Sequence, residues 1–377
     1  MSNSSFKSFK LITELFSINP KNMRFPYFKR IVVVFLFVPF FSFLFIVNNF
    51  FLLIDNILFY KFKRVEIKQP VFIVSMPRTG TTMLLHMLSS FKTEFTTMKL
   101  WELLFAPSIT QKFIFLGVNK FDKNINSIIK KTIIFFSDIV FKNLTTLHNT
   151  GLEQPEEDEL ILLWSLSSGY FQYFYPESKN FDDFLDFDNQ VNPKQKKRIM
   201  KRYFRLVQRH NYVFNYSQKR TFISKNPFML SKIESIHDQF NDAKILTINR
   251  CPNLVINSVI NLNKLIFNSF SSVKIKSELK TRTIDLIKNW YFHSNKKFKE
   301  NPKIHHLYLD FEKLIKKDKD EFKTVFNFLN LNGCFLTYIS KKSYQNYKSK
   351  PKKTPQLKKY IDKDEIPFMK EYYKELI

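Results

Sequence analysis

The sequence predicts an α/β domain built on a parallel sheet and preceded by a hydrophobic helix near the N-terminus. Three observations lead to this fold class. Short apolar runs with the length of buried strands recur along the chain, longer segments with helical periodicity separate them, and one long uncharged segment precedes the first strand. The apolar runs are VFIVS at 71–75, TFIS at 221–224, KILTI at 244–248 and HHLYL at 305–309, and helices are expected at 82–91, 199–211 and 322–331.

The long apolar segment covers positions 31–54, which are 24 residues without a charge. A helix of that length spans a hydrocarbon core of about 30 Å, so a single-pass transmembrane helix is one expectation. The preceding segment, 1–30, is basic, and this bias predicts a cytosolic N-terminus with a lumenal, Golgi-type location for the rest of the chain. Pro39, Asn48 and Asn49 keep a second interpretation open, in which the helix anchors the protein by lying against the bilayer, or is simply buried.

Composition limits what the rest of the chain can do. The 377 residues carry a formal net charge of +27, which favours anionic ligands or membrane surfaces, although a Lys-rich composition explains much of it. The chain has no nucleic-acid reading motif, so no nucleic-acid partner is expected. The two cysteines, Cys251 and Cys334, lack the spacing of a metal site or of a disulfide framework. We therefore expect 67–377 to form one domain that needs no metal.

The most informative segment is VFIVSMPRTGTTMLLHML at 71–88, which has the order strand, tight loop, helix. Such a loop directs several backbone N–H groups to one point at a helix N-terminus, where an anion is favoured. The spacing follows the nucleotide-binding frame G-x-x-x-x-G-K-[ST], but a threonine stands in place of the lysine. A guanidinium inside the loop can bind two oxygens of a phosphate or sulfate instead. The expected anion-binding residues are Pro77, Arg78, Thr79, Gly80, Thr81 and Thr82.

The string PRTGTT after a strand resembles the 5′-phosphosulfate loop of the sulfotransferases that use 3′-phosphoadenosine 5′-phosphosulfate (PAPS) as donor. The resemblance implies a P-loop-like, three-layer fold with a central parallel sheet of about five strands. It also implies that 67–377 is a sulfotransferase catalytic domain, which moves a sulfuryl group from PAPS to a hydroxyl or amine acceptor.

The segment around Arg250 resembles a second signature of the same family. A predicted strand ends at Arg250, a Pro follows, and Ser258 comes eight residues after the Arg. The resemblance implies that Arg250 and Ser258 bind the 3′-phosphate of PAPS. It further implies that Lys225, in SKNP, lies near the transferred sulfuryl group, although a solvated lysine is the alternative. Two positions depart from the family pattern, because Cys251 replaces the usual Asp and Met229 replaces a His found in many relatives.

The acidic string GLEQPEEDELILL at 151–163 resembles the PEE segment in one branch of the family. Sulfuryl transfer needs a group that removes the acceptor proton, so Glu156 or Glu157 is expected to be the general base, with Glu157 preferred. The alternative is structural, because a Pro followed by acids and an apolar run is also typical of a helix N-terminus. His86 has the same two interpretations, either reaching the donor site or packing beneath the loop.

Two rival hypotheses stay open. One is a catalytically inactive, membrane-anchored nucleotide-binding protein of the same fold. The departures from the family pattern at Cys251 and Met229 favour this hypothesis. The other is a P-loop nucleotide kinase or hydrolase, which Thr81 at the lysine position disfavours. The acceptor itself is not encoded in any motif, and a glycan, a lipid and a small alcohol are all candidates. The mixed region 92–220 is expected to shape its binding site.

Overall fold

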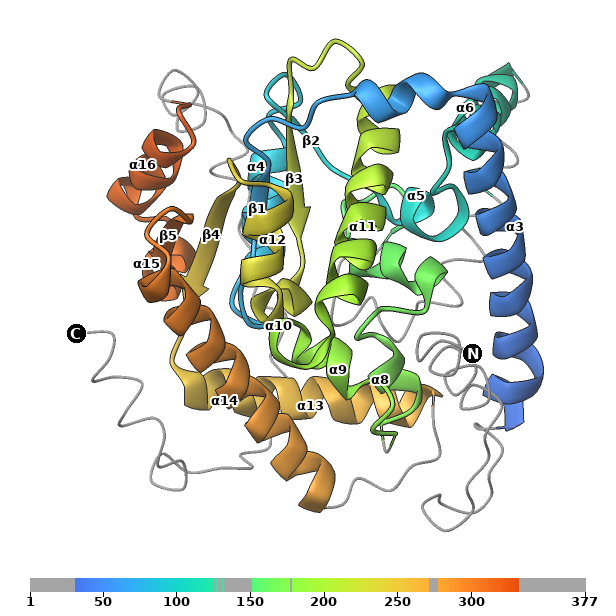
Figure 1. Cartoon of the computed structure of the whole chain (residues 1–377). Helices are drawn as coiled ribbons and strands as arrows, with labels where there is room; N and C mark the ends of the chain where they lie inside the picture. Colours follow the sequence, from blue (N-terminus) through green and yellow to red (C-terminus); the bar gives the residue numbers. More distant parts are fainter. Residues whose placement is uncertain are drawn as a thin grey trace.

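Five parallel strands form the central sheet, in the order β2-β3-β1-β4-β5 (Figure 1). The structure is a computed structural model that describes residues 31–124, 127, 131, 151–176, 178–270 and 277–331. The basic segment 1–30 and the end of the expected domain, 332–377, lie outside the described residues. The strands are β1 (Val71–Ile73), β2 (Phe95–Thr96), β3 (Thr221–Lys225), β4 (Lys244–Asn249) and β5 (His305–Asp310).

The fold class predicted from the sequence is confirmed. All four predicted strands are present with small differences at their ends, and the three predicted helices correspond to α4 (Thr81–Ser89), α11 (Pro193–Phe214) and α16 (Lys319–Phe328). The fifth strand, β2, was not predicted from the sequence, because two residues are too few to leave a pattern.

Helices cover both faces of the sheet because neighbouring strand residues point in opposite directions. Ile73 and Leu246 face a core that includes Leu84 of α4 and Phe326 of α16. Phe72, by contrast, faces a larger core built from helices on the other side. These helices include α11, α12 (Ile233–Gln239), α13 (Pro252–Phe270) and α14 (Ser277–Glu300), while α15 (Phe311–Lys316) joins α4 and α16 on the first side.

The position of β1 in the sheet brings the predicted site residues at the strand ends together. β1 lies between β3 and β4, with Ile73 opposite both Lys225 and Leu246. Because the strands are parallel, the segments that follow β1, β3 and β4 leave the sheet at the same edge. The loop at 74–80, Lys225 and Arg250 are therefore neighbours, although they are far apart in the sequence.

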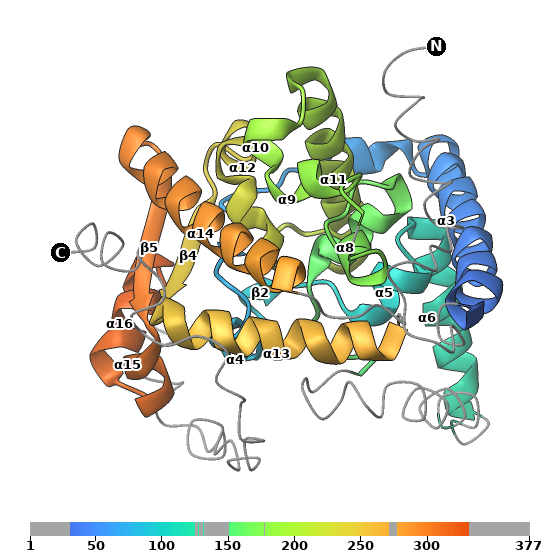
Figure 2. The ribbon, with the colours of Figure 1, turned by 90° about the horizontal axis from the view of Figure 1, so that it is seen from below.

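The predicted hydrophobic helix is α3 (Val38–Leu58), which continues from a short turn of π-helix, η2 (Val33–Phe37). Among the described residues, Val34–Leu58 is long and apolar enough to cross a membrane by length and composition, a test that buried core helices and signal sequences also pass. α3 lies side by side with α6 (Ile109–Asn124) at the end of the molecule away from β5 (Figures 1 and 2). The remaining elements are η3 (Tyr60–Arg64), α5 (Leu100–Phe105), η4 (Asp158–Ser165), α8 (Phe171–Phe174), α9 (Asp182–Leu185), α10 (Phe187–Gln190) and η5 (Pro227–Ser231).

Candidate active site

The loop between β1 and α4 is a tight turn that leads directly into the N-terminus of α4. Gly80 has a φ of +84°, which a residue with a side chain rarely adopts, and it directly precedes the first residue of α4. Thr79 closes the turn from inside, since its hydroxyl donates a hydrogen bond to the carbonyl oxygen of Met76 at 2.7 Å. Arg78 also has a positive φ, +70°, so the backbone is strained where the guanidinium leaves the loop. The N-terminus of α4 therefore opens beside Arg78.

The two predicted anion sites are in direct contact. The Nε atom of Arg78 donates a hydrogen bond to the Ser258 hydroxyl at 3.2 Å, and Nη1 of Arg250 donates to the carbonyl oxygen of Arg78 at 2.5 Å. The Arg250 guanidinium also stacks on the ring of Phe311, 4.1 Å from its centroid. The sequence motifs around positions 78 and 250 thus form one site at the carboxyl edge of the sheet.

This site has an excess of positive charge. Within the described part of the chain, no carboxylate forms an ion pair with Arg78 or Arg250, and the buried Nε of Arg250 has no hydrogen-bond partner. Burial lowers the pKa of both guanidinium groups, and the neighbouring Arg78 lowers that of Arg250 further. Two adjacent cations without a carboxylate partner are a site that a phosphate or sulfate would stabilise.

Lys225 lies at the end of β3 and contacts the predicted base. Its Nζ is 2.6 Å from Oε1 of Glu157 and 3.8 Å from Oε1 of Glu156. The lysine side chain is only 1% exposed, so the alternative of a solvated lysine is wrong. The other carboxylate oxygen of Glu157 accepts a hydrogen bond from the hydroxyl of Tyr170. Glu157 is consequently fixed by two donors, and its side chain retains 15% exposure.

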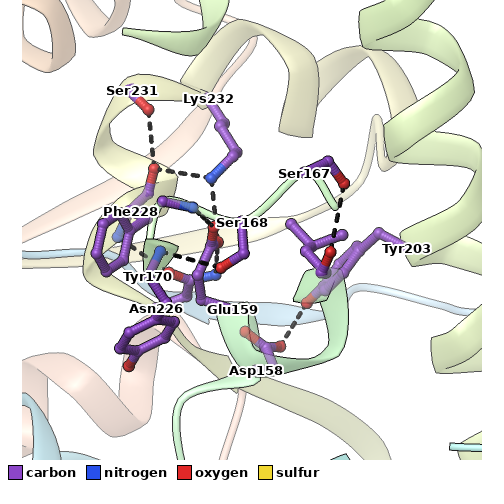
Figure 3. A network of polar contacts seen from close by, with 12 residues as sticks. Asp158, Glu159, Ser167, Ser168, Tyr170, Tyr203, Asn226, Phe228, Ser231 and Lys232 are labelled. Atoms are coloured by element: carbon purple, nitrogen blue, oxygen red, sulfur yellow. Dashed lines mark hydrogen bonds and ion pairs between the residues drawn. The ribbon is translucent and has the colours of Figure 1, made fainter. Parts of the chain in front are cut away.

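The acidic residues of the segment have two different environments: some are buried in hydrogen bonds within the fold, and others line a cavity. A 3₁₀-helix, η4, begins at Asp158, so the structural alternative holds for the acids in its first turn. The carboxylate of Glu159 is fully buried and accepts hydrogen bonds from Asn226 at 2.9 Å and Lys232 at 3.1 Å (Figure 3). Asp158 is equally buried and accepts one from the Tyr203 hydroxyl at 2.5 Å (Figure 3). Glu156 and Glu157, just before the helix, line a cavity instead.

This cavity has a volume of about 1580 Å³ and is lined mainly by apolar and aromatic side chains. Its lining includes Arg78, His86 and Glu157. The lining also extends to α3 and α6, where Phe41 and Phe115 contribute to the wall. The cavity is large enough for an acceptor with a sizeable apolar body.

Sequence reasoning did not identify Tyr170 or the aromatic wall of the cavity. Tyr170 sits in a segment of mixed composition, and only the fold brings it to Glu157. Burial, together with the adjacent carboxylate of Glu157, raises its pKa well above the ordinary value, so the phenol stays protonated and can donate. At the two positions that depart from the family pattern, Cys251 is a half-buried free thiol and Met229 is fully buried in the core. In the described residues, no group of His, Cys, Asp and Glu side chains is arranged to hold a metal ion.

Comparison with protein families matches positions 70–333 to the sulfotransferase family. Two curated relatives, the omega-hydroxy-beta-dihydromenaquinone-9 sulfotransferases Stf3 of Mycobacterium bovis and Mycobacterium tuberculosis, are each 29% identical over 200 residues. The match covers 52% of this chain and 46% of each relative, so the chain matches about half the length of these proteins.

Solved structures share the fold. Sulfotransferase STF1 from Mycobacterium tuberculosis H37Rv superposes with a TM-score of 0.63 at 15% identity, covering 88% of this chain and 84% of the other. Sulfotransferase STF9 from Mycobacterium avium gives 0.55 at 13% identity, with 74% and 69% covered. At these identities the similarity establishes the architecture alone.

Proposed function

The chain belongs to the sulfotransferase family, and from this membership we propose that it transfers a sulfuryl group from PAPS to a hydroxyl or amine acceptor. The observation that carries the proposal is the pair of adjacent cations, Arg78 and Arg250, which form no ion pair with a carboxylate in the described residues and lie beside the N-terminus of α4. PAPS carries two anionic groups, a 5′-phosphosulfate and a 3′-phosphate, and a site of this charge favours both.

We assign the donor contacts by motif and geometry together. The loop containing Pro77, Thr79, Thr81 and Thr82 is the proposed cradle of the 5′-phosphosulfate, with Gly80 allowing close approach of the backbone. Arg250 and Ser258 are the proposed partners of the 3′-phosphate. The Ser258 hydroxyl accepts a hydrogen bond from Arg78, and its own O–H can donate to a phosphate oxygen at the same time.

In the proposed reaction, the acceptor oxygen attacks sulfur while Glu157 accepts the acceptor proton. A new S–O bond forms, the bond from sulfur to the bridging phosphate oxygen breaks, and adenosine 3′,5′-bisphosphate leaves. Arg78 and Lys225 neutralise the negative charge that develops on the leaving phosphate. Lys225 also donates a hydrogen bond to Glu157 at 2.6 Å. This contact fixes the position of the proposed base relative to the lysine that would neutralise the leaving phosphate. Glu156 is the second candidate base.

Among the possible acceptors, the cavity favours a hydroxyl on a large apolar body, such as a lipid, over a glycan. Its walls are mainly aromatic and aliphatic, which would leave most sugar hydroxyls without partners. The curated relatives are named for omega-hydroxy-beta-dihydromenaquinone-9, and we propose an acceptor of that broad type, an alcohol with a long apolar part. The lumenal, Golgi-type location predicted from the basic segment 1–30 requires α3 to cross a bilayer, and it stays a prediction.

Equilibrium binding tests the donor assignment. Adenosine 3′,5′-bisphosphate is titrated into the full-length protein by calorimetry, with ATP as the competing ligand. The proposal expects the bisphosphate to bind at least about tenfold more tightly than ATP, because only the former offers a 3′-phosphate to the Arg250 site. Tighter binding of ATP with Mg²⁺, accompanied by ATP hydrolysis, would instead support the kinase or hydrolase hypothesis.

A further inference from the structure

One face of α3 is apolar and exposed. Phe43, Ile46, Phe50, Leu53 and Ile57 recur at helical spacing and are 57–77% exposed. We call these five residues the apolar face. α6 lies beside it and adds exposed apolar side chains of its own, among them Phe121 at 61%. An apolar patch of this size is unusual on a soluble surface and marks an interaction site.

The opposite face of α3 is fixed to the protein by buried polar groups. Asp55 is fully buried and accepts hydrogen bonds from Nε of Arg209 at 2.9 Å and from the backbone N–H of Ile109 at 2.8 Å. Asn48 is also fully buried, and its side chain bonds to Gln111 at 2.7 Å and to the Leu104 carbonyl at 3.1 Å. A helix that left the domain to cross a bilayer would carry these groups into hydrocarbon without partners, which is costly.

Positive charge borders the apolar face. Lys61, Lys63 and Arg64 follow α3 directly in η3 and are exposed, and Lys120 and Lys123 are exposed on α6. An exposed apolar stripe with lysine and arginine at its border matches the chemistry of an anionic lipid surface, where the apolar side chains enter the acyl region and the cations meet the headgroups.

The cavity of the active site reaches the same end of the molecule. Phe40 of α3 and Phe115 and Val118 of α6 line the cavity, yet they are 40–53% exposed. Arg78 and Glu157 line the same cavity. One cavity therefore borders both the exposed side chains of α3 and α6 and the proposed base.

We propose that α3 and α6 dock this protein on one leaflet of an anionic bilayer without crossing it, and that the acceptor enters the cavity laterally from that leaflet. The docking part stands on the exposed face and the buried polar anchors of α3. The acceptor route rests on the proposed function, because it requires Glu157 to be the site of sulfuryl transfer.

Vesicle sedimentation of the full-length protein tests the docking. Vesicles of phosphatidylcholine with phosphatidylglycerol are compared with vesicles of phosphatidylcholine alone, using wild type, Ile46→Glu and Ile57→Glu. Each variant should bind the anionic vesicles at least about tenfold more weakly, because an apolar contact is replaced by a charge that the headgroups repel. Ile315→Glu is the matched control, since Ile315 is 51% exposed on α15, at the other end of the molecule (Figure 1).

Equal vesicle binding by wild type and Ile46→Glu would overturn the proposal. The proposal would also be overturned if wild type did not bind vesicles but formed a dimer that Ile46→Glu dissociates. The apolar face would then bind a second copy of the chain. Binding of adenosine 3′,5′-bisphosphate in solution should be unchanged in Ile46→Glu, and this readout separates failure of the docking from failure of the donor assignment.

Cysteine labelling distinguishes docking from crossing. Ile31→Cys and Tyr60→Cys, at the two ends of the helical segment, are made in a chain whose two native cysteines are replaced by serine, and each protein is added to sealed vesicles. A membrane-impermeant maleimide should label both positions from outside. Protection of one end, with labelling of the other, would show that the helix crosses the bilayer.

Discussion

The Nε atom of Arg78 lies 3.2 Å from the hydroxyl oxygen of Ser258, across 180 positions of the sequence. This contact joins the loop after β1 to the helix after β4. It is possible because β1 and β4 are adjacent parallel strands, whose following segments leave the sheet at one edge. We propose that both motifs bind one ligand, and the positive charge at this contact favours an anionic one.

Removing either guanidinium should weaken nucleotide binding. A hydrogen bond to a charged group contributes roughly 1.5–3 kcal/mol, so Arg78→Ala and Arg250→Ala should each weaken binding of adenosine 3′,5′-bisphosphate by about 10- to 100-fold. Calorimetric titration measures this change. Lys303→Ala, which removes an exposed cation elsewhere, should have little effect. If all three variants bound alike, the net charge of the chain rather than this site would explain binding.

Glu157→Gln should abolish most of the transfer reaction while leaving the donor bound. The substitution keeps the shape of the side chain but removes the proton acceptor, and loss of a general base costs roughly 10²- to 10⁴-fold in rate. Glu156→Gln is the matched control, because Glu156 lies farther from Lys225, at 3.8 Å against 2.6 Å. Initial rates with saturating PAPS compare the two. If Glu156→Gln lost more of the initial rate than Glu157→Gln, Glu156 would be the general base.

Tyr170→Phe should lower kcat by about tenfold and leave the affinity for the nucleotide unchanged. The tyrosine hydroxyl donates to Glu157 beside Lys225, and without it the carboxylate loses a donor that holds it in place. Tyr173→Phe provides the comparison, because Tyr173 lines the same cavity. We expect it to retain a rate close to wild type. If the rate of Tyr170→Phe equalled that of wild type, Tyr170 would contribute to packing only and would not position Glu157.

Local sequence was sufficient for the strands and the loop, whereas the residues around the base required the tertiary structure. The strand β1 and the string from Pro77 to Thr82 are contiguous, so periodicity and motif identify them. Tyr170 is adjacent to Glu157 only because η4 and the turn after it fold back, which no spacing rule encodes. The acidic segment was ambiguous for the same reason, since burial alone separates Glu159 from Glu157.

Asp158 should make the stability of the protein depend on pH. Burial raises its pKa from 3.8 to about 7. Between these two values the folded protein binds more protons than the unfolded chain, so the free energy of unfolding falls as pH rises through that window. Asp158→Asn removes the titration and keeps an oxygen for the Tyr203 hydroxyl.

Chemical denaturation of wild type and Asp158→Asn at several pH values measures this dependence. The variant should gain stability relative to wild type as pH increases from about 5 to about 8. Parallel curves for the two proteins over this range would mean that Asp158 is ionised in the folded state, and that its burial is compensated by its neighbours.

Label transfer from PAPS that carries radioactive sulfur tests directly whether the chain is a PAPS-dependent sulfotransferase. Wild type, Arg78→Ala and Arg250→Ala are incubated with this donor and with lipid and glycan fractions of a cell extract. Wild type should move label to the lipid fraction, and both variants should lose this activity. A wild-type protein that neither binds PAPS nor transfers label to any fraction would contradict it.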